Sequence, residues 1–222
     1  MKVTVVINVE GQDDAVSSCV EGCRHQIDSI EAEGKYSFDM VLNTDGKTSF
    51  ETVMADAQSF PDFCLWIGEP VSLNEGAIAS MLENSEFLRH RAIIAGTVCD
   101  NEKRMLYGGR SKYGKLVEPD PIIPVPCHLY DAVLLLIPRY AFRKVASPSD
   151  LFKQGFFDYG CGEKAARANV PRVVAPGICG VTQGTEIHSV WKDSSKPMTD
   201  RLVSLLASIG REMLRVIHSI IR

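Results

Sequence analysis

The chain has 222 residues, of which 45% are hydrophobic and 23% are charged, proportions typical of a soluble globular protein. The net charge of −4 argues against non-specific binding of nucleic acid. No apolar run approaches the roughly 18–20 residues that cross a bilayer, and the opening MKVTVVINVEG lacks the cleavage site of a signal peptide. We therefore expect a cytoplasmic protein with no nucleic-acid partner.

The seven cysteines form no regular C-x-x-C pairs, and the five histidines have no metal-ligand spacing. Cys19 and Cys23 are four residues apart, on the apolar face of a predicted helix. We interpret both as small core residues rather than as metal ligands.

The first predicted elements form a strand–helix–strand unit. A β-branched run at residues 3–9 predicts a central strand, a turn at residues 11–14 starts a helix that ends near Glu31, and residues 37–42 predict a second strand. Short connections between such elements are typical of a parallel βαβ unit. Asp45 and Gly46 lie in the turn after the second strand.

The middle of the chain continues this alternation. We expect a short helix at residues 50–59, a third strand at 63–67, a helix at about 74–83 and a strand at 92–99, with residues 105–110 returning from it. This return ends in the letters YGGR, followed by SKYGKLVEP. Two adjacent glycines before an arginine permit close backbone approach to a ligand with a cation beside it. A β-turn with a solvated arginine is the alternative interpretation.

The next segment carries the candidate acidic residues. Asp131 precedes the apolar run 132–137, which predicts a buried strand, and Asp158 lies in a loop between predicted helices. Those helices cover residues 139–145 and 162–168, and a short strand at 172–175 is closed by Pro176-Gly177. Residues beyond strand ends line the ligand crevice of an open α/β sheet, so the two aspartates are the first candidates for chemistry.

The last part of the chain predicts a surface loop at residues 185–198 and an amphipathic helix at 199–222. Four basic residues form a stripe on this helix: Arg211, Arg215, His218 and Arg222. Such a helix packs on its own domain, binds a protein partner, or lies on an anionic membrane at the inner face. All three alternatives stay open, as does a homo-oligomer.

Three segments carry a resemblance to a known family: YGGRSKYGKL, LLLIPRYAFRKV, and FFDYGCGEKAARANV followed by RVVAPGICG. They resemble the rhamnosyltransferase-like branch of the inverting family 2 glycosyltransferases. The resemblance covers about residues 3–184. It implies a GT-A fold, with a mostly parallel sheet flanked by helices, and transfer of a sugar from a nucleotide-sugar donor. The acceptor would be a polysaccharide or lipid-linked glycan in bacterial cell-surface glycan synthesis.

The resemblance also implies site residues. Asp158 matches the first aspartate of the family's acidic pair and is the candidate base, with Asp131 assisting. The residues implied for nucleotide-sugar binding are Asp45, Gly46, Glu69, Gly108, Gly109, Arg110 and Lys164. A divalent cation, manganese or magnesium, is the implied cofactor if the protein is active, and Glu69 is its candidate ligand.

The chain departs from the family at two places. Gly68-Glu69-Pro70 stands where the family has its metal-binding aspartates, so only Glu69 offers a carboxylate. The segment between Gly46 and the third strand is also much shorter than in the family, which removes a wall of the nucleotide pocket. Two hypotheses remain: a working transferase in which Arg110, Lys112 or Lys164 neutralises the phosphates, and a non-catalytic GT-A domain that binds or scaffolds a polysaccharide-assembly complex. A third, weaker hypothesis is a domain that binds a free nucleotide or small sugar without transferring it.

Overall fold

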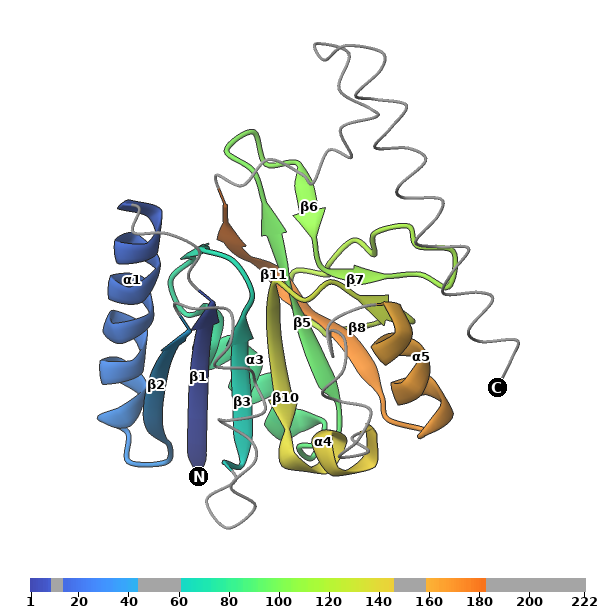
Figure 1. Cartoon of the computed structure of the whole chain (residues 1–222), viewed down its shortest axis with the longest axis horizontal. Coiled ribbons are helices and arrows are strands. Elements are labelled where there is room, and N and C mark those ends of the chain that lie inside the picture. Colours follow the sequence, from blue (N-terminus) through green and yellow to red (C-terminus); the bar gives the residue numbers. More distant parts are fainter. Residues whose placement is uncertain (9–13, 44–60, 146–158, 183–222) are drawn as a thin grey trace. The chain divides into compact units, whose positions relative to one another are not determined.

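A computed structural model of the chain describes residues 1–8, 14–43, 61–145 and 159–182 (Figure 1). The chain divides into two compact units, Met1–Gln183 and Gly184–Arg222, and all the described residues belong to the first. The predicted helices at 50–59 and 199–222 and the loop at 185–198 lie outside the described residues. No helix of the described part is long and apolar enough to cross a membrane.

A mixed β-sheet forms the centre of the first unit. Its strands follow one another in the order β2 (Ser37–Asn43), β1 (Lys2–Asn8), β3 (Phe63–Ile67), β10 (Leu134–Pro138), β5 (Ile93–Cys99), β11 (Arg172–Val181) and β4 (Ser72–Leu73). β2, β1 and β3 pair in parallel, as do β5 and β11, whereas β10 runs antiparallel between β3 and β5. The expected α/β class with a mostly parallel central sheet is confirmed.

Two short strands extend this sheet, and two others form a second one. β6 (Met105–Tyr107) pairs with β5, and β8 (Val125–Pro126) pairs with β11. β7 (Gly109–Arg110) and β9 (Leu129–Tyr130) form a separate two-stranded sheet. The YGGR letters therefore span the end of β6 and all of β7.

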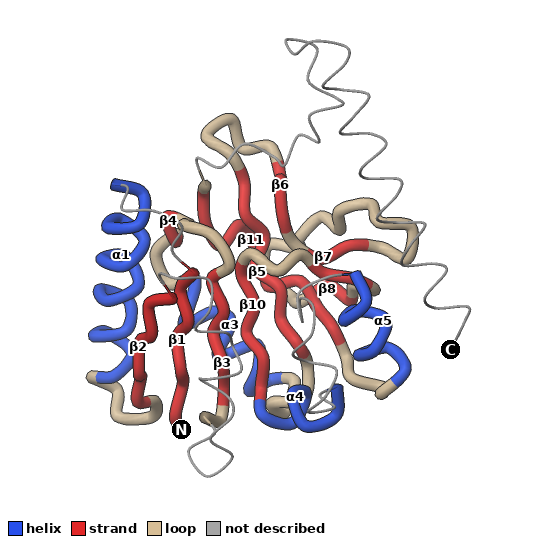
Figure 2. The backbone as a smooth tube through the Cα atoms, viewed as in Figure 1, coloured by secondary structure: helices blue, strands red, loops and turns tan. Residues whose placement is uncertain are grey.

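Helices cover both faces of the sheet (Figure 2). α1 (Asp14–Glu31) and α3 (Ala77–Phe87) share one core cluster with Val5 and Leu65. α4 (Arg139–Val145) and α5 (Tyr159–Arg167) contribute to a second cluster with Val6. Neighbouring residues of one strand thus face opposite layers, and burial of both faces explains why the strands are continuous apolar runs.

Several predicted boundaries differ from the structure: the helix expected at 162–168 covers Tyr159–Arg167, and the one expected to end near residue 83 ends at Phe87. The helix expected from about Asn74 begins at Ala77. The side chain of Asn74 instead donates a hydrogen bond to the carbonyl oxygen of Ile178 in β11, at 2.7 Å. The strand expected to close at Pro176-Gly177 continues to Val181, and that prediction was wrong. The register with β5 shifts between Val174 and Ile178, so the proline and glycine form an irregularity within the strand instead of its end.

Candidate functional site

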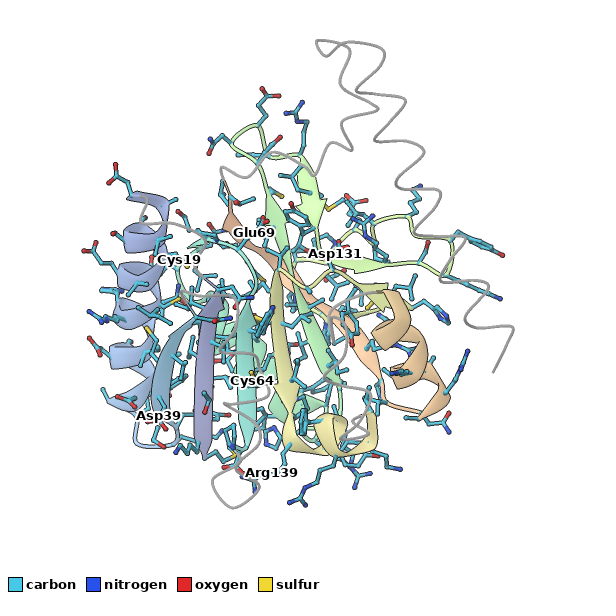
Figure 3. All side chains as sticks on the ribbon, in the orientation of Figure 1. Cys19, Asp39, Cys64, Glu69, Asp131 and Arg139 are labelled. Atoms are coloured by element: carbon cyan, nitrogen blue, oxygen red, sulfur yellow. The ribbon has the colours of Figure 1, made fainter. Side chains whose placement is uncertain are left out.

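The candidate site lies where the parallel strands end. β1, β2 and β3 end at Asn8, Asn43 and Ile67, at one edge of the sheet. Because β10 is antiparallel, its first residue, Leu134, pairs with Ile67 at the same edge. The segment before β10, which contains Asp131, therefore meets the segment after β3, which contains Glu69 (Figure 3). Ligands of open α/β sheets bind at this kind of edge.

Gly68 is in close contact with the segment before β10. Its N–H donates to the carbonyl oxygen of Val133 at 2.8 Å, and the indole N–H of Trp66 donates to the carbonyl oxygen of Ala132 at 3.0 Å. A Cβ atom at position 68 would lie 2.0 Å from that same oxygen of Ala132. No side chain fits here unless the backbone moves, so position 68 cannot supply a carboxylate beside Glu69.

Glu69 is half-buried, and its environment favours the protonated carboxyl. Burial raises the pKa of Glu69, and hydrogen bonding by the Tyr107 and Thr182 side chains only partly opposes this effect. Its Oε1 atom is buried without a hydrogen-bond partner among the described residues. The hydroxyl of Thr182 also donates to the carbonyl oxygen of Pro70 at 3.0 Å, which fastens this loop to the end of β11.

Asp131 is paired with the arginine of the YGGR letters. Nε of Arg110 lies 2.7 Å from Oδ1 and 2.9 Å from Oδ2 of Asp131, and both side chains are largely buried. The N–H of Gly108 also donates to Oδ2, at 3.1 Å, and Nη1 of Arg110 donates to the carbonyl oxygen of Gly114 at 3.0 Å. Residues 107–117 form what we call the YGGR hairpin, in which Arg110 and Leu116 make an antiparallel bridge. Asp131 anchors this hairpin, because both of its oxygens accept hydrogen bonds from it.

The remaining predicted residues occupy different surroundings. A Cβ at Gly109 would lie 2.4 Å from Cγ2 of Val174 and 2.8 Å from Cβ of Cys127, so the absence of a side chain there is required by packing. Lys164 is exposed on α5, a helix that packs on β9. Asp45, Gly46 and Asp158 lie outside the described residues. The structure thus brings together Glu69, the hairpin and Asp131.

Two asparagines at this edge were not among the sequence-based candidates. Asn43 is 6% exposed, and its side-chain N–H donates to Oδ1 of Asn8 at 2.7 Å. Its own Oδ1 is buried and has no partner within the described part of the chain. Each asparagine is the last residue of a parallel strand. That position, directly after an apolar run, is the signal by which they could have been found.

The described residues do not fit a divalent cation. They contain no group of three or more histidine, cysteine, aspartate or glutamate side chains arranged to hold a metal ion. At the candidate edge, Asp131 is already bound by Arg110, and Glu69 has a raised pKa, which opposes the ionised form that a metal requires.

No protein-family model matches the chain, and no curated protein sequence matches it. Solved structures resemble it at low sequence identity. The mannosyltransferase PcManGT from Pyrobaculum calidifontis, solved with GDP-Man and Mn²⁺, has a TM-score of 0.51 and 10% identity, and the match covers 98% of this chain and 79% of that one.

Two further structures have lower scores. TarS 1-349 of S. aureus has a TM-score of 0.47 and 10% identity, covering 93% of this chain and 72% of that one. GalNAc-T7, solved with UDP, GalNAc and Mn²⁺, has a TM-score of 0.48 and 10% identity, and this chain spans 43% of its length. The topology and the similarity to the PcManGT structure define the class of the protein: it has the GT-A fold of glycosyltransferases.

Proposed function

We propose that this protein is a glycosyltransferase-like protein that binds a nucleotide sugar at the carboxyl edge of its sheet. The observation that carries the proposal is the convergence of Glu69, the YGGR hairpin and Asp131 at the edge where α/β sheets bind ligands. The sugar would pass to a polysaccharide or lipid-linked acceptor in bacterial cell-surface glycan synthesis. The rhamnosyltransferase-like branch is the finer part of the proposal and rests on the sequence motifs alone.

The proposed roles follow the residue chemistry. Asp158 would take the proton of the acceptor hydroxyl while that oxygen attacks the sugar and the nucleoside diphosphate leaves, which inverts the anomeric centre. Asp45 would bind the nucleoside. Arg110 is tied to Asp131, so the exposed Lys112 and Lys164 are the better candidates to meet the phosphates. We derive no step through a metal ion, because the described residues do not fit one.

A second candidate function is a non-catalytic GT-A domain that binds or scaffolds a polysaccharide-assembly complex. Two observations favour it: Glu69, the one carboxylate of Gly68-Glu69-Pro70, has a raised pKa, and Asp131 is engaged by the hairpin. For either function we also propose a cytoplasmic location. Residues 199–222 would contact a membrane or a protein partner.

The experiment that tests the first proposal is isothermal titration calorimetry of the full chain with UDP, dTDP and GDP, each with and without Mn²⁺. We expect one nucleotide to bind, and Asp45→Ala or Glu69→Ala to weaken its binding at least tenfold. Asp39→Ala is the matched control, because Asp39 is exposed on β2 and pairs with Lys2. Absence of heat with all three nucleotides, on folded protein, would refute nucleotide binding.

A second measurement separates the two functions. Release of nucleoside diphosphate from the matching nucleotide sugar, with loss of that release in Asp158→Asn, would support transfer. Tight nucleotide binding without release would instead support the non-catalytic domain. The two readouts need no assumption about the acceptor, because slow hydrolysis of the donor by water also releases the diphosphate.

A further inference from the structure

A cavity of about 260 Å³ lies at the edge of the sheet opposite to Glu69. Its walls come from Met1 and from three further segments: the residues that open β3, the loop after α3, and the end of β10 with the start of α4. Figure 3 shows Arg139, one of the wall residues, near the strand ends that are far from Glu69 and Asp131. The cavity is therefore separate from the candidate nucleotide site.

The charged side chains of this cavity are unbalanced. Arg89, Arg91 and Arg139 face a single carboxylate, Asp62. That carboxylate is already engaged, because Oδ1 lies 3.3 Å from Nη2 of Arg139 and Oδ2 accepts the backbone N–H of Lys2 at 2.8 Å. Among the described residues Arg89 and Arg91 form no ion pair. Two positive charges at the cavity are thus left without an internal counter-charge.

The backbone that carries these two arginines has an unusual conformation. Arg89 and His90 have φ angles of 56° and 54°, in the left-handed region that non-glycine residues seldom adopt. One hydrogen bond and one ring contact stabilise it: the N–H of His90 donates to the carbonyl oxygen of Ser85 at 2.6 Å, and the centroid of the His90 ring lies 5.1 Å from that of Phe63 in an edge-on arrangement. This turn places arginines on both sides of His90 in the wall of one cavity.

The aromatic ring of Tyr140 fixes the second arginine. Cζ of Arg91 lies 5.4 Å from the centroid of that ring, within the range of a cation–π contact. Arg143 and Lys144 continue the positive charge on the exposed side of α4. The cavity therefore opens on a basic surface, although the whole chain is acidic.

We infer that this cavity binds the phosphoryl group of an anionic ligand. A phosphate monoester carries about −1.5 to −2 charges at neutral pH, which matches the two uncompensated arginines. The planar guanidinium group donates paired hydrogen bonds to phosphate oxygens. The volume is below the roughly 300–1,000 Å³ of pockets for drug-sized ligands, so it suits a phosphoryl group rather than a whole nucleotide. The group comes either from a free phosphorylated molecule or from a phospholipid headgroup beside the basic surface of α4.

The test uses the full chain in a chloride buffer of constant ionic strength. Binding of inorganic phosphate is followed by calorimetry and by the melting temperature, and binding to vesicles of phosphatidylcholine with phosphatidic acid is followed by sedimentation. The variants are Arg89→Gln, Arg91→Gln and the pair together. Arg91→Gln lies outside the left-handed pair, so it removes the charge without a change at a strained position. Arg24→Gln is the control, because it removes an exposed arginine from α1, which is not part of the cavity.

We expect saturable phosphate binding that each single variant weakens about tenfold and the double variant abolishes, with Arg24→Gln unchanged. Retention of this binding in Glu69→Gln would show that the phosphate is not at the nucleotide site. Vesicle binding with the same dependence on Arg89 and Arg91 and no saturable phosphate binding would identify a lipid headgroup as the source. Absence of both, or binding that is equal in Arg91→Gln and wild type, would overturn the inference whatever the result for nucleotides.

Discussion

The carboxylate of Asp131 receives both the side chain of Arg110 and the backbone N–H of Gly108, at 2.7 Å and 3.1 Å. A residue that the sequence pattern suggests for catalysis therefore holds a hairpin in place. With Asp131 engaged in this way, Asp158 stays the proposed base.

We first predict that Asp131→Asn and Arg110→Gln each destabilise the protein by about 1–3 kcal/mol, because each leaves a largely buried polar partner poorly satisfied. Urea denaturation of the two single variants and the double variant gives the coupling energy. The loss in the double variant should be clearly smaller than the sum of the single losses. Strict additivity would mean that the two side chains act independently.

The second prediction concerns Gly68. Gly68→Ala should destabilise the protein by about 2 kcal/mol or more, since the new Cβ would lie 2.0 Å from the carbonyl oxygen of Ala132. Gly22→Ala is the matched control, because Gly22 lies within α1 with no atom in the way of a Cβ. That control should be stabilising by up to about 1 kcal/mol. Equal stability of the two variants in thermal unfolding would contradict the close contact at position 68.

The third prediction is a pH dependence. Burial raises the folded-state pKa of Glu69, so the protonated carboxyl stabilises the folded state relative to the unfolded state. This stabilisation is lost as the pH rises through the folded-state pKa. Glu69→Gln removes the charged form. The free energy of unfolding of this variant, relative to wild type, should therefore increase between pH 4 and pH 7. Glu118→Gln, at an exposed position, controls for the loss of one negative charge, and an identical trend in both variants would refute the role of burial.

The fourth prediction separates packing from ligand binding at Gly109. Gly109→Ala should destabilise the hairpin, because the added methyl group would meet Cγ2 of Val174 at 2.4 Å. Part of this loss should be recovered by Val174→Ala in the same chain, measured as non-additive changes in the free energy of unfolding. If Gly109 served only a bound ligand, stability would be unchanged and nucleotide affinity alone would fall.

Much of the fold could be predicted from hydrophobic pattern. The strands expected at 63–67 and 92–99 are continuous apolar runs, and α1 has a clear apolar face. The predicted positions of these elements are therefore close to the observed ones. Strand direction is not encoded in such runs, because an apolar run is the same for a parallel and an antiparallel neighbour. The antiparallel direction of β10 between β3 and β5 is therefore visible only in the structure.

The site was predictable only in part, for a related reason. The letters Gly68-Glu69-Pro70 show which carboxylates are missing, but not that the carbonyl oxygen of Ala132 fills the space beside Gly68. In the same way the sequence contains Arg110 and Asp131 without indicating that they pair across the hairpin. Contacts between residues far apart in the chain depend on the packed backbone, and local pattern does not specify them.

The central position of β10 also has a consequence for biosynthesis. On the ribosome β3 and β5 are both complete once Cys99 has emerged, yet the strand that joins them is complete only at Pro138. During that interval the facing edges of the two strands lack their partner, and unpaired apolar strand edges promote association between nascent chains. The two flanks of the sheet are therefore joined late in synthesis, and any pause in translation between these points lengthens the period in which both strand edges are exposed.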